Sequence, residues 1–472
     1  MLNHVIEVVL MALLIFTPIA FGSIELWASS LMEVGILFVI ILFAIDKSII
    51  GFRKNSISPS PIDASRHLRL NPSTHLPIYA MLSLFLLLIL FQMLPLPSGM
   101  VKVISPKTFA LRNSLTFDLS PSPFSLSFVP FATQIEFLKW VTLSGLFFFL
   151  LNWRNSNKDV VRLMIIIMFV GITESLYGML EFFSGHRHIL NLNMQISAVT
   201  GTFINRNYFA GYLLMVIPLT MGYFFSREAF RRNQFMGWRH RLSSLDGKTF
   251  LIAFGIILMI LALLFSSSRM GIASLLLSFS LISLLFKESQ KGQRFSKTTV
   301  LIFGLALLWA AWIGLDAVIS RFFTLSEDFE NRWNVWINTF QIFKDFPFFG
   351  SGLGTFVHIF PVYRSFHIRG LFTHAENDFL QLLSEVGLIG VGLLLFAFIL
   401  LFYRAVLAIR SFHSGDPQKY IAMGGLVGIL ALMFHSLVER NIQIPANAFL
   451  FTFIFAFVLR IGVAKEEKRL PS

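Results

Sequence analysis

Long apolar runs divide this sequence and constrain its fold more than any other feature. Each run is about as long as a helix that crosses the roughly 30 Å hydrocarbon core of a bilayer, where backbone groups must pair within the segment. The runs cover 4–21, 27–45, 76–95, 133–152, 161–182, 207–225, 249–266, 270–286, 299–317, 383–403, 420–437 and 446–463. They predict an all-α, polytopic membrane protein of about 12 transmembrane helices.

The composition excludes a soluble protein. Hydrophobic residues make up 56% of the 472 residues and charged residues only 13%, whereas soluble domains carry about 25% charged residues. Cysteine is absent, which excludes disulfides, thiolate metal sites and a cysteine nucleophile. No phosphate-binding loop of the G-x-x-x-x-G-K-[ST] type occurs, so we do not expect ATP-driven transport by this chain.

The positive charge indicates an orientation in the membrane. The net charge of +13 falls in short segments between the apolar runs, and not on one soluble face as nucleic-acid binding would require. With the N-terminus placed in the cytoplasm, the segments on that side hold 25 of the 38 Lys and Arg residues, and those on the opposite side hold 12. Because cytoplasmic loops carry an excess of positive charge, we expect both termini in the cytoplasm and any chemistry on the outer face.

The longest segment outside the predicted spans divides the chain into three parts. Residues 1–317 form predicted helices 1–9, residues 318–382 a periplasmic or interfacial helical segment, and residues 383–472 predicted helices 10–12 with a cytoplasmic tail. Aromatic residues from Trp333 to Phe343 recur at helical spacing, which predicts a helix lying along the interface. No strand precedes the glycines at 350–354, so we interpret this stretch as a turn or a close backbone approach.

Polar residues gather just before the tenth predicted span. His374, Glu376 and Asn377 lie there, and Arg364 precedes them in the same outer segment. Group transfer from a diphosphate needs a base for the acceptor hydroxyl and fixed cations for the leaving group, and this cluster offers both. The same residues could serve only as interfacial anchors, and this alternative stays open at this stage.

Further arginines interrupt the apolar runs at their outer ends. They are Arg206, Arg269 and Arg440. An Arg at the bilayer centre costs about 2.5–3.5 kcal/mol on insertion scales and less near the end of a span, so an anchoring role is also possible for each. Together they predict a phosphate-binding set, since guanidinium groups pair with phosphate bidentately. We expect Asn205, Asn377 and His435 to support this site.

Five motifs occur in an order that resembles the O-antigen ligase/polymerase family of bacterial inner-membrane glycosyltransferases. They are GTFINRNYFAGYLL, SSSRMGI, NRWNVWINTFQIFKDFPFFGSGLGTF, THAENDFLQLLSEVGLIG and HSLVERNIQIPANAFLF, and together they cover roughly 200–455. The resemblance implies an inverting, metal-independent transferase of the GT-C type in the inner membrane, with its active site facing the periplasm and no cofactor. It also implies a polyprenyl-diphosphate-linked glycan, such as an undecaprenyl diphosphate, as donor, and a lipid-linked glycan or lipid A-core as acceptor.

The resemblance also assigns roles to residues. Arg206, Arg269 and Arg332 look like the arginines that hold the donor diphosphate. O-antigen ligases share a motif in which His is followed by Asn, Ser or Gln, then by nine residues and Gly-x-x-Gly. This chain has Glu376 at the position of the His. A carboxylate can accept the same proton, so we predict Glu376 as the base, with His374 as the second candidate. The replacement leaves ligase, polymerase and protein glycosyltransferase activities open.

Two other functions compete with a transferase. A transporter or flippase of lipid-linked glycans would place ionisable residues in the middle of spans, whereas most outward cations here lie at their ends. A membrane scaffold without catalytic activity would make every polar cluster structural. We therefore predict a transferase first and a transporter second.

Overall fold

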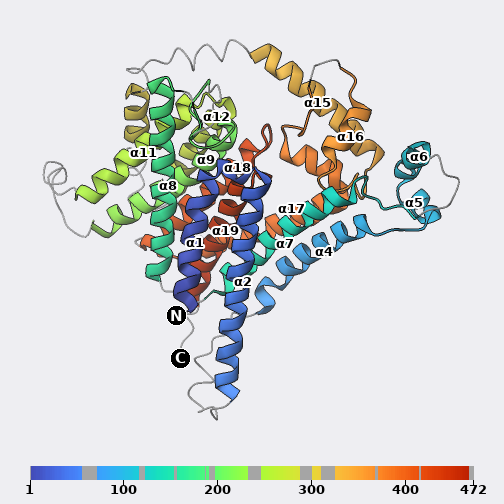
Figure 1. Ribbon diagram of the computed structural model, residues 1–472. Coiled ribbons are helices and arrows are strands. Elements are labelled where there is room, and N and C mark those ends of the chain that lie inside the picture. The colour runs from blue at the N-terminus through green and yellow to red at the C-terminus, as the bar shows by residue number, and fades with distance from the viewer. Residues whose placement is uncertain are drawn as a thin grey trace.

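The computed structural model describes residues 2–55, 72–115, 123–153, 157–186, 188–190, 197–231, 246–287, 300–309, 325–366, 370–413 and 416–466. These residues form helices joined by loops (Figure 1), with an isolated β-bridge between Leu96 and Phe124. The all-α, polytopic class predicted from the apolar runs is therefore confirmed.

The long helices coincide with the predicted runs to within a few residues at most ends. They are α1 (Leu2–Ile19), α2 (Leu26–Asn55), α4 (Pro72–Met93), α7 (Pro130–Asn152), α8 (Asn157–Ser184), α9 (Arg206–Arg231), α11 (Gly247–Phe265), α12 (Arg269–Lys287), α17 (Asp378–Arg410), α18 (Pro417–His435) and α19 (Pro445–Glu466). Within the described part of the chain, 9 helices are long and apolar enough to cross a membrane.

The apolar segments of α12 and α19, and the helix in the predicted run 299–317, are shorter. They cover Arg269–Leu285, Pro445–Ile461 and Val300–Trp309. The rest of the predicted run 299–317 lies outside the described residues. The count of about twelve spans therefore stays a prediction.

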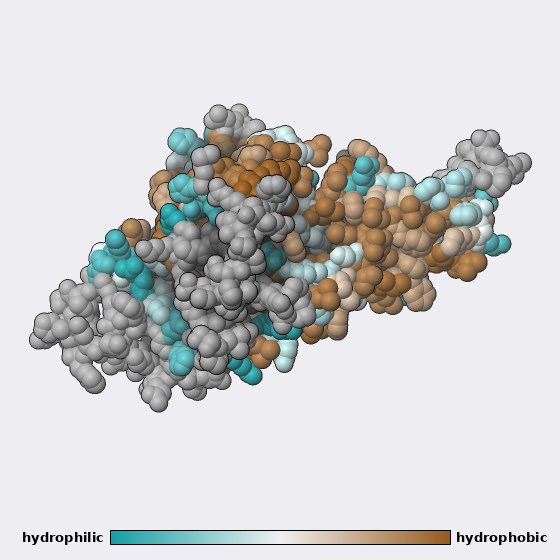
Figure 2. Space-filling model, turned by 90° about the horizontal axis from the view of Figure 1, so that it is seen from below, coloured by the Kyte–Doolittle hydropathy of each residue, from teal (hydrophilic) through white to brown (hydrophobic). Residues whose placement is uncertain are grey.

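Helices α9 and α18 form the centre of the bundle. Gly222 of α9 packs against the carbonyl of Tyr420, and Gly424 of α18 packs against the carbonyl of Pro218. Small residues let two helix backbones approach closely, and close van der Waals packing is what holds helices together in lipid. The outer helices instead expose large apolar side chains, such as Leu87 of α4, and Figure 2 shows such a surface on its right-hand side.

Figure 1 shows four shorter helices at the end of the bundle opposite the N- and C-terminal marks. They are α5 (Ser98–Ile104), α6 (Pro106–Leu115), α15 (Leu325–Asp345) and α16 (Phe356–Tyr363). Helices α15 and α16 share an apolar core that includes Ile342, Phe346 and Phe360. Helix α15 confirms the helix predicted from the aromatic spacing, while its position along a membrane surface stays a prediction. We call this end of the bundle the site end and the other the terminal end.

The segment 347–354, which follows α15 and contains three glycines, packs against a kink in α17 and forms hydrogen bonds with it. Gly387 has φ +64°, and the amide groups that follow it donate to this segment, Leu388 N to the carbonyl of Pro347 at 2.8 Å and Ile389 N to that of Phe348 at 3.2 Å. Gly350 packs in turn against the carbonyl of Glu385. A residue with a Cβ would not fit at either glycine, so the close backbone approach predicted from the sequence is confirmed.

Candidate active site

The loop between α18 and α19 is tied directly to the start of α17. The carboxylate of Asp378, the first residue of α17, accepts hydrogen bonds from the backbone N–H groups of Asn441 at 2.7 Å and Ile442 at 2.8 Å. Asp378 N donates to the carbonyl of Ser436 at 3.1 Å, and Asn377 caps α17 by accepting from Leu380 N at 3.0 Å. These bonds hold the segment 374–377 beside the loop 436–444.

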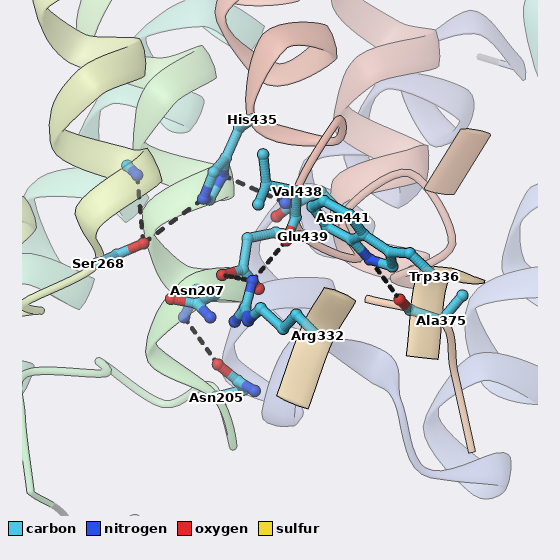
Figure 3. Close-up of polar contacts among 11 residues, drawn as sticks. Asn205, Asn207, Ser268, Arg332, Trp336, Ala375, His435, Val438, Glu439 and Asn441 are labelled. Atoms are coloured by element: carbon cyan, nitrogen blue, oxygen red, sulfur yellow. Dashed lines mark hydrogen bonds and ion pairs between the residues drawn. The ribbon is translucent and has the colours of Figure 1, made fainter. Parts of the chain in front are cut away.

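Arg332 of α15 reaches the same loop. Its Nη1 forms an ion pair with Glu439 Oε1 at 2.7 Å and donates to the carbonyl of Val438 at 2.5 Å (Figure 3). The Glu439 side chain is only 6% exposed and that of Arg332 28%. Asn207, near the start of α9, is in hydrogen-bonding contact with the Glu439 carboxyl group. Three distant parts of the chain thus meet around one buried acid.

Glu376 lies within the same electrostatic environment. Burial raises the pKa of its carboxyl group, and the positive charges of Arg332 and Arg440 partly oppose this effect. Its backbone has φ +52°, an unusual conformation for a residue other than glycine. Trp336 of α15 fixes the preceding residue, because its Nε1 donates to the carbonyl of Ala375 at 3.0 Å.

His374 and Glu439 differ sharply as proton acceptors. Burial, with the charges of Arg440 and Lys139 as smaller causes, lowers the pKa of His374 to about 2, so its imidazole is neutral and a weak base. Its Nδ1 is buried and has no hydrogen-bond partner among the described residues. Burial raises the pKa of Glu439 to about 7, against the opposing charge of Arg332. A carboxyl group that titrates near neutral pH suits proton transfer.

Arg440 completes the cluster. Its charge acts on His374 and Glu376, and its guanidinium group is in hydrogen-bonding contact with the hydroxyl of Tyr208. Its Nε is buried, and no described residue accepts a hydrogen bond from it. A buried donor without an acceptor is costly, unless a ligand or water supplies the missing partner.

Arg206 and Arg269 each begin a helix that packs against α18. Arg206 is the first residue of α9, next to Asn205, whose Oδ1 accepts from Asn207 N at 2.8 Å. Arg269 is the first residue of α12. Arg364 is exposed at the end of α16, and its Nη1 donates to the carbonyl of Gly370 at 3.1 Å.

A buried polar bridge connects the start of α12 to the 436–444 loop. Ser268 Oγ lies 3.5 Å from His435 Nε2, and Asn441 Nδ2 lies 3.2 Å from His435 Nδ1 (Figure 3). All three side chains are buried. His435 therefore supports the loop that carries Glu439 and Arg440, and its place behind them agrees with a supporting role.

The structure gathers some predicted residues more tightly than others. The contacts and charges above bring together Arg332, Arg440, Glu376 and His374, with Asn205, Asn377 and His435 on the elements that hold them. No sequence motif assigns a role to Glu439, Tyr208 or Asp378. A polar residue directly beside a predicted site arginine, as Glu439 is beside Arg440, was the available signal.

No metal site is visible in the described ranges. No group of three or more His, Asp or Glu side chains there is placed to hold a metal ion. The site contains guanidinium, carboxyl, amide and hydroxyl groups, the kinds of group that can bind phosphate oxygens and accept protons.

Residues 254–397 match a family model described as O-antigen ligase. The match runs from α11 into α17 and includes Arg269, Arg332 and Glu376, whereas Arg206 and Arg440 lie outside it. It confirms the resemblance to the O-antigen ligase/polymerase family and supports a membrane glycosyltransferase of the ligase/polymerase type. A search of curated proteins found no match to this chain.

Proposed function

We propose that this chain, as a multi-pass membrane protein of the O-antigen ligase/polymerase family, moves a glycan from a polyprenyl-diphosphate donor to an acceptor hydroxyl. The reaction takes place on the periplasmic face of the inner membrane. The observation that carries the proposal is a buried carboxyl group, Glu376, in the field of two guanidinium groups, those of Arg332 and Arg440. The guanidinium groups can pair with the phosphates of the donor, and the carboxylate can accept the proton of the acceptor hydroxyl.

The reaction is a direct displacement with inversion at the anomeric carbon. The acceptor oxygen forms the new glycosidic bond while the bond between the anomeric carbon and the diphosphate oxygen breaks, and its electron pair leaves with the diphosphate. Glu376 takes the proton of the acceptor hydroxyl. Arg332 and Arg440, together with Arg206 and Arg269, stabilise the charge on the leaving group, which needs no general acid.

Glu376 is a better base than His374. The raised pKa of the Glu376 carboxyl group increases its proton affinity, while the pKa of about 2 for His374 leaves that imidazole unable to hold a proton near neutral pH. His374 instead offers its unpartnered Nδ1 to a hydroxyl group of a substrate.

Glu439 keeps Arg332 in place until the donor arrives. Binding of the diphosphate draws Arg332 from Glu439, which would leave a buried carboxylate unpaired. Because the pKa of Glu439 is about 7, this group can take up a proton at little cost when the exchange occurs. The ion pair is thus a resting contact that a phosphate can replace.

A transfer assay with purified protein in detergent tests the proposal. Wild-type protein should form a new glycosidic bond from a polyprenyl-diphosphate-linked glycan, whereas a flippase would form none, since detergent provides no compartments. Glu376→Gln should lower the rate about 10²–10⁴-fold, which is the usual contribution of a general base. Arg440→Lys should weaken donor binding, because Lys cannot replace a bidentate contact.

Matched variants separate the site from the rest of the surface. Glu330→Gln changes an exposed acid on α15, two residues before Arg332, and should transfer glycan at the wild-type rate. Full activity of both Glu376→Gln and Arg440→Lys would exclude this site.

The glycan products of a deletion strain distinguish the two activities of the family. Free lipid A-core with accumulated long polymer would indicate a ligase, and single-repeat caps would indicate a polymerase. Because Glu376 stands where ligases have His, we propose polymerisation or exopolysaccharide elongation on equal terms with ligation.

A further inference from the structure

A pocket at the terminal end of the bundle is separate from the candidate active site. It is lined by Leu150, Trp153, Leu163, Phe453, Phe457 and Arg460. These residues belong to the end of α7, the beginning of α8 and the last turns of α19.

Helix α7 connects this pocket with the site end. Thr133, near the start of α7, donates from Oγ1 to the carbonyl of Leu353 at 2.8 Å, in the segment 347–354 that packs on α17. Trp153 caps the other end of the same helix. Twenty residues at 1.5 Å each separate the two by about 30 Å along the axis of α7. The pocket therefore lies at the end of α7 opposite the site end.

The polar groups of the pocket suit an anionic ligand. The Arg460 guanidinium lies 6.0 Å from the centre of the Trp153 ring. Trp153 is 2% exposed, and its indole Nε1 has no hydrogen-bond partner among the described residues. A buried indole N–H without an acceptor is unusual, because Trp normally pairs this group when it is buried. The pocket thus combines a cation and an unmatched donor with four apolar side chains.

We propose that this pocket binds one anionic phospholipid of the cytoplasmic leaflet. The phosphate group accepts a hydrogen bond from Trp153 Nε1 and pairs with Arg460, and an acyl chain lies along Leu163, Phe453 and Phe457. The lining is mostly apolar, so water would find few hydrogen-bond partners there. A basic pocket between helices at the cytoplasmic surface is also where anionic headgroups bind.

Native mass spectrometry of the full chain tests the proposal. The protein is reconstituted in vesicles of phosphatidylcholine and phosphatidylglycerol at a ratio of nine to one, extracted into mild detergent, and analysed for retained lipid. Wild-type protein should retain one phosphatidylglycerol despite the excess of phosphatidylcholine. Arg460→Gln should lower this retention at least fivefold, since one cation near an anionic surface contributes about that factor.

Two further variants keep the result decisive. Trp153→Phe removes the indole N–H and keeps an aromatic ring, so it should also lower retention. Arg410→Gln removes an exposed cation from the end of α17, outside the pocket, and should retain lipid as wild type does. Equal retention of the two lipids by wild-type protein, or equal losses in Arg460→Gln and Arg410→Gln, would overturn the proposal. Because the pocket and the active site lie at opposite ends of α7, glycan transfer can succeed or fail independently of this result.

Discussion

Glu439 should make the stability of this protein depend on pH in a way that one substitution removes. Its folded-state pKa of about 7 lies above the ordinary value of 4.5. Between these two values the unfolded chain has released this proton while the folded chain keeps it, so the free energy of unfolding falls as pH rises. A difference of about 2.5 pKa units corresponds to on the order of 3 kcal/mol, fully lost above pH 7.

Glu439→Gln isolates this contribution. The amide cannot titrate, yet it can still accept a hydrogen bond from Arg332, which is 28% exposed. The unfolding entropy of proteins is roughly 2.1 cal/mol/K per residue, so 3 kcal/mol in a chain of 472 residues corresponds to a shift of roughly 3 °C. Raising the pH from 5 to 8 should therefore lower the Tm of the wild type by roughly 3 °C more than that of Glu439→Gln.

Thermal unfolding of both proteins in the same detergent, followed by intrinsic fluorescence at several pH values, measures the difference. Glu330→Gln, on the exposed face of α15, serves as the control and should follow the wild type. If wild type and Glu439→Gln lose the same Tm over this pH range, Glu439 does not hold a proton in the folded state, and its exchange with the donor diphosphate is refuted.

Three other substitutions test how the site is held. Gly387→Ala should destabilise the protein by about 1–3 kcal/mol, because φ is +64° there. Gly392→Ala in the same helix meets no neighbouring atom and serves as the control. Equal Tm values for the two variants would contradict the strain expected at Gly387. Gln92→Leu, in α4, should cost at least about 2 kcal/mol, since the carbonyl of Phe349 and the N–H of Leu353 lose their partner, while the carbonyl of Glu385 keeps the N–H of Gly352; a Tm within 1 °C of wild type, roughly, would count against this. Trp336→Phe should lower kcat roughly three- to tenfold and lower Tm by only about 1–3 °C, because it leaves the buried carbonyl of Ala375 without its donor; unchanged kcat would show that Glu376 needs no such support.

The membrane helices could be predicted from the sequence because lipid imposes one simple requirement. A run of about 20 apolar residues must form a helix there, and the same reasoning recovered the short helix that begins at Arg269. The kink at Gly387 was not foreseen. A glycine inside an apolar run is compatible with a straight helix, and only the fold brings up the distant carbonyl of Phe348, which leaves no room for a Cβ at this position.

The site could be predicted by residue type but not by pairing. Arginines at the ends of spans, and an acid beside a histidine, indicated phosphate binding and proton transfer. The ion pair of Arg332 with Glu439 joins residues more than a hundred positions apart, and no local pattern encodes such a contact. The low proton affinity of His374 likewise arises from burial by residues distant in sequence, which explains why the two candidate bases could not be separated before the fold was known.

A structure of the full chain with a non-transferable polyprenyl-diphosphate glycan analogue would test the central claim most directly. The account predicts both phosphates at the site end, within hydrogen-bonding distance of the guanidinium groups of Arg440 and Arg332. It also predicts that Arg332 has moved away from Glu439, and that Glu376 faces the anomeric carbon. Phosphates bound elsewhere on the chain, with the ion pair between Arg332 and Glu439 intact, would contradict it.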